Sequence, residues 1–125
     1  MKVMIVDDEQ DVEMLFRQRF RKEIKAGQVE FRFAFSGDEA LRYLDHPEAA
    51  DCAWIFSDVN MPGMNGFELL RRVKAAYANV QVFMMTAYGD DRNFQLAMSG
   101  GADGYFTKPL DFEDLKRRIL KREQE

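Results

Sequence analysis

Five short apolar runs alternate with five segments of helical periodicity, and this alternation constrains the fold more than any other feature of the chain. The apolar runs occupy residues 2–6, 31–35, 53–57, 80–85 and 104–106. Strands that alternate with helices in this way predict a parallel sheet that is covered by helices on both faces through right-handed crossovers. We therefore expect an α/β fold with a single, doubly wound, five-stranded sheet and five helices.

Capping residues and periodicity indicate where the expected helices lie. The first runs from Glu9 to Lys25, where apolar residues recur at every fourth position. Ser36 and Glu39 have the spacing of a capping box and start the second, which stops before Pro47. The remaining three helices are expected at residues 66–77, at residues 91–99 and after Asp111.

The helix expected at residues 91–99 carries three apolar side chains at helical spacing, Phe94, Ala97 and Met98. We expect all three to be buried, because apolar residues three and four positions apart share one face of a helix.

Length and composition restrict the class of protein. A chain of 125 residues with 46% hydrophobic and 32% charged residues suggests one globular domain over residues 1–125. No apolar run approaches the roughly 20 residues that a membrane span needs, and the acidic start is not that of a signal peptide. The single cysteine, Cys52, fits a reducing compartment, so we expect a cytoplasmic protein without membrane contact. The net charge of −4 argues against direct binding of nucleic acid.

Polar residues follow the expected strands where ligands bind in sheets of this type, beyond their carboxyl ends. Asp7 and Asp8 follow the first strand, and Asp58 follows the third, before a loop rich in proline and glycine. Thr86 follows the fourth strand and Lys108 the fifth. Clustered carboxylates repel one another, and an all-oxygen ligand set favours a hard divalent cation, so we expect Mg²⁺. A site with Mg²⁺, a lysine and a hydroxyl is suited to hold a phosphoryl group, with Asp58 as the candidate nucleophile.

Four motifs of the chain resemble those of one known family. They are IVDDE at residues 5–9, SDVNMPGMNG at 57–66, MTAYGD at 85–90 and GADGYFTKP at 101–109. Their order and spacing are similar to those of the receiver domains of two-component response regulators. The resemblance covers essentially the whole chain, and it implies a flavodoxin-like three-layer sandwich with the strand order 2-1-3-4-5.

The resemblance also implies a role for each acidic residue. Asp58 would accept a phosphoryl group from a histidine of a partner kinase and become an aspartyl phosphate. Asp8 and Asp58 would ligate Mg²⁺ directly, together with the backbone carbonyl of Asn60, and Asp7 would act through water. The domain would not be an enzyme, apart from Mg²⁺-dependent self-phosphorylation from a phosphodonor and self-dephosphorylation.

Further residues would bind the phosphoryl group or respond to it. By the same resemblance, Thr86 and Lys108 would each contact a phosphoryl oxygen, and the Lys108–Pro109 peptide bond would be cis. Tyr105 would be the aromatic residue that turns inward when Thr86 moves toward the phosphoryl group. The small side chain of Ala87 leaves room for a phosphodonor.

Two positions are expected to set the lifetime of the acyl phosphate, Asn60 and Tyr88, which lie two residues beyond Asp58 and Thr86. The partners implied are a histidine kinase or phosphotransfer protein, and an output domain or partner protein. The output face would consist of the helix at residues 91–99, the strand at 104–106 and the last helix. The same face could also form a homodimer.

Three other functions compete with the signalling switch. An aspartyl-phosphate hydrolase uses a similar sheet, but usually carries a second aspartate where this chain has Asn60, and it has a cap insertion. A flavin carrier needs a hydroxyl-rich phosphate loop after the first strand, where this chain is acidic. A receiver-like module that no longer needs phosphorylation would not require the intact acidic set.

Overall fold

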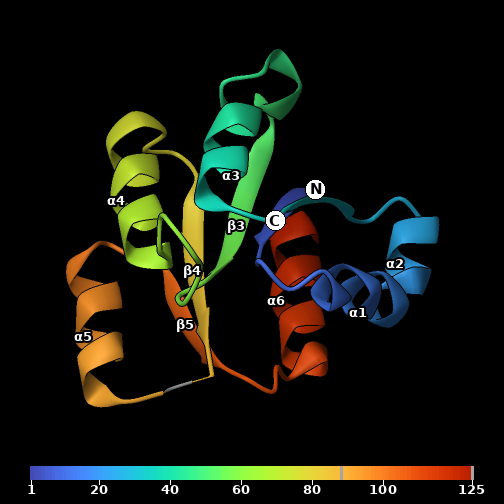
Figure 1. The fold of residues 1–125 in the computed structure, drawn as a ribbon. Coiled ribbons are helices and arrows are strands. Elements are labelled where there is room, and N and C mark those ends of the chain that lie inside the picture. The colour runs from blue at the N-terminus through green and yellow to red at the C-terminus, as the bar shows by residue number, and fades with distance from the viewer. Residues whose placement is uncertain (88, 125) are drawn as a thin grey trace.

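Five parallel strands form one sheet in the order β2-β1-β3-β4-β5, flanked by helices. The computed structural model shown in Figure 1 describes residues 1–87 and 89–124. The elements within these residues are β1 (Lys2–Val6), α1 (Asp11–Arg19), α2 (Arg21–Lys25), β2 (Glu30–Ala34), α3 (Gly37–Leu44), the 3-10 helix η1 (Pro47–Ala49), β3 (Cys52–Asp58), α4 (Gly66–Ala76), β4 (Gln81–Thr86), α5 (Asp91–Ser99), β5 (Gly104–Thr107) and α6 (Phe112–Gln124). The α/β class and the predicted strand order are confirmed.

The expected single helix from residue 9 to residue 25 was wrong, since the chain forms α1 and α2 there. The two helices meet at Phe20, whose φ of −104° and ψ of 18° depart from helical values. The ring of Phe20 is fully buried, with its centroid 5.0 Å from that of Phe31. The change of direction keeps this ring in the core while Arg21, Lys22 and Lys25 of α2 stay exposed. The described residues therefore contain six α-helices instead of the expected five.

The capping box before α3 is confirmed. Ser36 Oγ accepts a hydrogen bond from the backbone N–H of Glu39 at 3.0 Å, and Glu39 Oε2 accepts one from the N–H of Phe35 at 3.2 Å. The first bond satisfies an N–H group that the first turn of a helix leaves without a partner, and the second ties Phe35, directly before the cap, to α3. The start of α3 is therefore fixed directly beside the end of β2.

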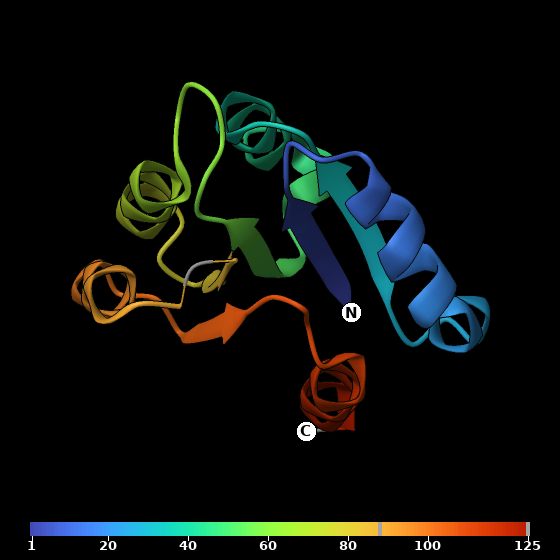
Figure 2. The ribbon, with the colours of Figure 1, turned by 60° about the horizontal axis from the view of Figure 1, so that its bottom comes forward.

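The helices cover the two faces of the sheet with different side chains, as the end-on view in Figure 2 helps to follow. We call the face under α3, α4 and α5 the aliphatic face, because its buried residues are Met, Leu, Ile, Val, Ala and Cys. We call the face under α1 and α6 the aromatic face. Its buried aromatic residues are Phe16, Phe20, Phe31, Trp54, Phe56, Phe83 and Phe112.

Helix α5 buries less than its sequence suggested. Ala97 is fully buried as expected, but Phe94 and Met98 are each 44% exposed, as is Leu96, so the prediction for Phe94 and Met98 was wrong. Helix α5 lies beside β5, which is one of the two edge strands and has only four residues. A short edge strand offers little sheet surface to cover, which leaves part of the apolar stripe of α5 outside the core.

None of the helices in the described part of the chain is both long enough and apolar enough to cross a membrane.

Candidate functional site

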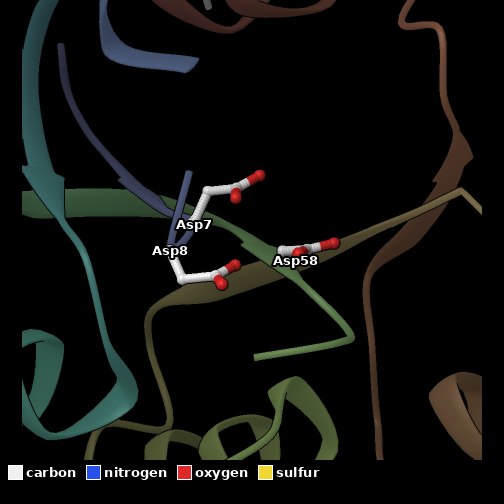
Figure 3. A group of neighbouring side chains, drawn as sticks. All are labelled: Asp7, Asp8 and Asp58. Carbon is white, nitrogen blue, oxygen red and sulfur yellow. The ribbon is translucent and has the colours of Figure 1, made fainter. Parts of the chain in front are cut away.

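Three carboxylates meet at the carboxyl edge of the sheet, as Figure 3 shows. Asp7 and Asp8 follow β1, and Asp58 is the last residue of β3. One oxygen atom from each lies within 4.8 Å of the other two. Asp7 and Asp58 are buried, whereas Asp8 is exposed to solvent. The structure therefore brings together the three acids that the sequence placed at this edge.

Backbone hydrogen bonds hold the two buried acids in place. The N–H of Asp7 donates to the carbonyl of Ala34 at 3.1 Å, and Asp7 Oδ1 accepts from the N–H of Glu9 at 3.0 Å. Beyond Asp58, the N–H of Val59 donates to the carbonyl of Met85 at 3.0 Å. The ladder between β3 and β4 thus continues past Asp58, and its carboxylate stands on a rigid strand end.

Lys108 supplies positive charge between the two buried acids. Its Nζ lies 2.9 Å from Asp7 Oδ2 and 3.5 Å from Asp58 Oδ1. Burial alone would lower the pKa of Lys108, but the hydrogen bond and the charge of Asp7, together with those of Asp58, raise it above its usual value. The N–H of Lys108 donates to the carbonyl of Thr86 at 2.8 Å, and the Lys108–Pro109 peptide bond is cis.

The carboxyl group of Asp58 is difficult to ionise. Its burial, followed by the negative charge of Asp7, raises its pKa from 3.8 to about 6, against the opposing effect of Lys108. A divalent cation would relieve this repulsion. Three carboxylates whose oxygen atoms approach one another this closely fit Mg²⁺, which prefers oxygen ligands and is often bound through carboxylates.

The fourth strand ends beside this cluster. Thr86 is the last residue of β4, is fully buried, and pairs with Thr107 of β5 in the sheet. Ala87 follows it and is exposed. Thr86 therefore borders the acidic site from the adjacent strand, and Ala87 adds no bulk to the approach.

Tyr105 lies on β5, opposite Met84 of β4, and not among the acids. Its half-buried ring packs against the aliphatic face and makes an edge-to-face contact with Phe94, at 5.5 Å between centroids. Burial, and to a lesser extent the charge of Asp90, raises the pKa of its hydroxyl. Tyr105 thus joins β5 to the exposed apolar side of α5.

Of the two positions expected to set the lifetime of the acyl phosphate, only Asn60 is among the described residues. Asn60 is exposed and lies two residues beyond Asp58, in the loop between β3 and α4. Tyr88 lies outside the described residues, so the expectation for it stays a prediction.

The sequence interpretation gave no role to Gly66, the first residue of α4. A side chain there would collide with the carbonyl oxygen of Asp58 and would lie 2.9 Å from the Cα of Val59. The N–H of Gly66 also donates to the carbonyl of Val59 at 2.9 Å. Glycine at this position allows α4 to begin directly beneath the acidic site. The available signal was a glycine at a helix start, shortly after a strand-ending aspartate.

A groove of about 210 Å³ opens beside Lys108, between α1 and the segment that follows β5. Its lining is largely apolar and includes Val12, Leu15 and Leu110. Met14, the neighbour of Leu15 on α1, is 72% exposed. An apolar surface therefore adjoins the acidic cluster.

The sequence profile of the response regulator receiver domain matches residues 3–120. The chain belongs to this family.

Relatives and solved structures agree with this assignment. The chain is 32% identical over 120 residues to sporulation initiation phosphotransferase F of Bacillus subtilis, covering 96% of this chain and 91% of that protein. It is 36% identical over 110 residues to response regulator protein FleR of Pseudomonas aeruginosa, covering 88% of this chain but only 22% of that protein. The chemotaxis protein CheY4 of Vibrio cholerae has a TM-score of 0.79 at 29% identity, with 96% of both chains covered. A CheY-like receiver domain from Methanospirillum hungatei has a TM-score of 0.83 at 25% identity, covering 98% of this chain and 93% of that one.

Membership of the family defines the general role of the chain. Receiver domains are signalling domains of two-component systems that accept phosphoryl groups, and they are generally not enzymes. They typically bind Mg²⁺ at acidic residues, and they interact with histidine kinases or phosphotransfer proteins and with output domains.

Proposed function

We propose that Asp58 is the phosphoacceptor of this domain and receives its phosphoryl group from a histidine of a partner kinase or phosphotransfer protein. One carboxylate oxygen of Asp58 would form a bond to phosphorus while the bond from phosphorus to the donor nitrogen breaks, and the imidazole takes up a proton. The observation that carries this proposal is the position of Asp58, at a rigid strand end with a second buried acid and Lys108 beside it.

Asp7, Asp8 and Asp58 would hold Mg²⁺ together with the backbone carbonyl of Asn60. When bound, Mg²⁺ would neutralise charge on the phosphoryl oxygens during transfer. Lys108 already lies within 4 Å of both buried acids and would pair with a phosphoryl oxygen.

Phosphorylation would then shift a packing equilibrium in the domain. The added negative charge and acceptor oxygens would draw the hydroxyl of Thr86 toward Asp58, and Tyr105 would occupy the space that Thr86 leaves. A complete switch from 1:99 to 99:1 requires about 5.5 kcal/mol of differential stabilisation, and partial activation requires less. The affected output face consists of α5, β5 and α6, on which Phe94, Leu96 and Met98 are exposed.

The phosphodonor would approach along the groove between α1 and Lys108. The exposed Met14 and the groove residue Leu15 offer apolar contacts to a helix of the partner, and Ala87 leaves the route to Asp58 open. Asn60 and Tyr88 would tune how long the acyl phosphate survives.

The output of the switch is a further proposal. The chain spans 22% to 49% of several of its curated relatives, so an output domain or a separate partner protein would receive the signal. A homodimer through the face formed by α5, β5 and α6 is a second route. We propose a cytoplasmic protein that does not itself bind nucleic acid, in keeping with its single cysteine and its net charge of −4.

Intact mass spectrometry after incubation with Mg²⁺ and acetyl phosphate tests the phosphoacceptor. We expect a labile gain of one phosphoryl group in the wild-type protein and none in Asp58→Ala. A wild-type protein that gains no phosphoryl group and also fails to bind beryllofluoride would contradict the proposal. Steady multiple-turnover release of phosphate from a range of monoesters would instead indicate an aspartyl-phosphate hydrolase, for which the structure offers no favouring observation.

A further inference from the structure

The candidate magnesium ligands are held in different ways. Asp7 and Asp8 follow β1, Asp58 ends β3, and Asn60 lies in the loop between β3 and α4. The ladder between β1 and β3 pairs Val6 with Ser57 and so sets the separation of Asp7 and Asp58, whereas the carbonyl of Asn60 depends on its loop. Because residues that support metal ligands strongly affect affinity, the contacts that anchor this loop bear on metal binding.

The loop between β3 and α4 is closed at its base and anchored by two methionines. The N–H of Gly66 donates to the carbonyl of Val59 at 2.9 Å, which closes the base. Between these residues, Met61 is buried and Met64 packs against the aliphatic face. Asn60 directly precedes Met61, so the position of its carbonyl depends on how the loop is anchored.

Met64 lies against the first residue of α3. A Cβ atom added to Gly37 would lie 2.7 Å from Sδ of Met64 and 3.1 Å from its Cβ and Cγ. Gly37 does not have a positive φ, so its backbone conformation does not require glycine. The space beside Gly37 is instead taken by the side chain of Met64, so a larger residue at position 37 would require Met64 to shift.

The first turn of α3 is also close in the chain to a residue that contacts Asp7. The N–H of Asp7 donates to the carbonyl of Ala34, and α3 starts three residues later behind its Ser36 cap. This hydrogen bond, the short chain segment after Ala34 and the contact of Gly37 with Met64 together connect Asp7 to the loop between β3 and α4.

We infer that the contact between Gly37 and Met64 braces the loop between β3 and α4 against the start of α3, and so fixes the carbonyl of Asn60 relative to Asp7, Asp8 and Asp58. Gly37 and Met64 are then positioning residues for Mg²⁺, although neither touches the site. This inference rests on the proposed function, since it assigns a role in the magnesium binding that phosphorylation needs.

The test is the dissociation constant for Mg²⁺, measured by isothermal titration calorimetry on the unphosphorylated protein. In Gly37→Ala, the added methyl group displaces Met64 and the loop, and we expect the dissociation constant to rise about tenfold. Alanine is favoured over glycine within helices, so an effect limited to helix stability would not weaken metal binding.

Two further variants separate the brace from general crowding. Gly37→Ala combined with Met64→Ala removes the atoms that collide, so the double variant should bind Mg²⁺ more tightly than Gly37→Ala alone. Gly100→Ala is a matched control. Gly100 lies at the C-terminal end of α5, remote from the acids, and a Cβ atom there would lie 2.8 Å from Cδ2 of Leu70 on α4. This control should retain the wild-type dissociation constant.

The outcomes are distinct. A wild-type protein that binds no Mg²⁺ would contradict the proposed function itself. Wild-type binding with an unchanged dissociation constant in Gly37→Ala, or an equal loss in Gly100→Ala, would overturn the inference alone. If Gly37→Ala does not fold, Met64→Ala decides, since it introduces no collision. We expect its dissociation constant to rise about threefold, and no change would overturn the brace.

Discussion

The aromatic face and the aliphatic face of the sheet are packed in different ways. On the aromatic face, the ring of Phe16 has its centroid 5.2 Å from that of Phe112 and 5.6 Å from that of Phe31, both edge to face. On the aliphatic face, the buried side chains include Met4, Met61 and Met84. Rings in such arrangements have a preferred geometry, whereas the unbranched methionine side chain adapts to changes in its surroundings.

This difference suggests that the aromatic face is a rigid frame, and that the aliphatic face is the part that responds to phosphorylation. Neighbouring residues of β5 divide between the faces, with Tyr105 against the aliphatic face and Phe106 against the aromatic face. Thr86 shares its side of β4 with Met84, because side chains alternate along a strand. The residues proposed to move therefore lie on the adaptable side, and we expect the aromatic face to keep its packing.

The largest effect should come from removing the centre of the frame. Phe16 contacts four other phenylalanine rings, so Phe16→Ala should lower the free energy of unfolding by about 3–5 kcal/mol in urea denaturation. The folded fraction should still take up one phosphoryl group. A loss below about 1 kcal/mol would show that the rings are not the frame.

The free energy of unfolding should depend on pH through Asp58, which lies at the carboxyl edge of the sheet, between the two faces. Because the pKa of Asp58 is raised to about 6, the folded protein holds this proton more tightly than the unfolded chain does. The free energy of unfolding should therefore fall as the pH rises from about 4 to about 6 and stay low above that range.

Without Mg²⁺ at pH 7.5, Asp58→Asn should raise the free energy of unfolding by about 1–3 kcal/mol, and the gain should vanish near pH 4. Urea denaturation at the two pH values measures it. Saturating Mg²⁺ is the control, since the cation relieves the repulsion at Asp58 in the wild-type protein and should reduce the gain. A gain in the free energy of unfolding that is equal at both pH values would show that the raised pKa of Asp58 is not its cause.

At the amino-terminal end of the strands, away from the acidic site, Asp103 directly precedes β5 and contacts both α4 and β4. Its Oδ2 accepts from Lys74 Nζ at 2.6 Å and from the N–H of Val82 at 2.8 Å. Asp103→Ala leaves both donors without this acceptor and should cost about 1–2 kcal/mol, with the Mg²⁺ dissociation constant unchanged. Glu113→Ala, at an exposed position on α6, should change stability by less than about 0.5 kcal/mol. Loss of metal binding in Asp103→Ala would show that the two ends are coupled.

The smallest effect is expected at the rim of the aromatic face. The guanidinium carbon of Arg118 lies 5.0 Å from the ring centroid of Phe106, and its Nε lies 3.2 Å from Asp114 Oδ2. Arg118→Ala should cost about 0.5–1 kcal/mol in the same denaturation assay. Arg117→Ala is the matched control, because Arg117 pairs with the same Asp114 at 3.5 Å and stacks on none of the aromatic rings in the described part of the chain. Equal losses would assign the effect to Asp114 instead of the ring.

The sequence predicted the elements that depend on local chemistry. Strand runs, the capping box at Ser36 and the acidic residues at strand ends all follow from patterns a few residues long. The strand order came from the resemblance to receiver domains, since periodicity does not encode which strands are neighbours.

The sequence could not predict features that depend on the assembled fold. The stripe containing Phe16 and Phe20 is the same whether the helix is straight or bends, so the end of α1 was missed. The exposure of Phe94 and Met98 depends on the short edge strand β5. The contact of Gly37 with Met64 joins the start of α3 to the loop between β3 and α4, which only the folded sheet brings together.

The central claim is that a phosphoryl group on Asp58 alters the aliphatic face and leaves the aromatic face unchanged. Amide hydrogen exchange, measured with Mg²⁺ in the presence and absence of acetyl phosphate, tests it most directly. We predict altered protection in α5 and β5, around Phe94 and Tyr105, and unchanged protection in α1 around Phe16 and in β2 around Phe31. In Asp58→Ala, acetyl phosphate should change neither region. Equal changes on both faces, or changes confined to α1, would contradict the account.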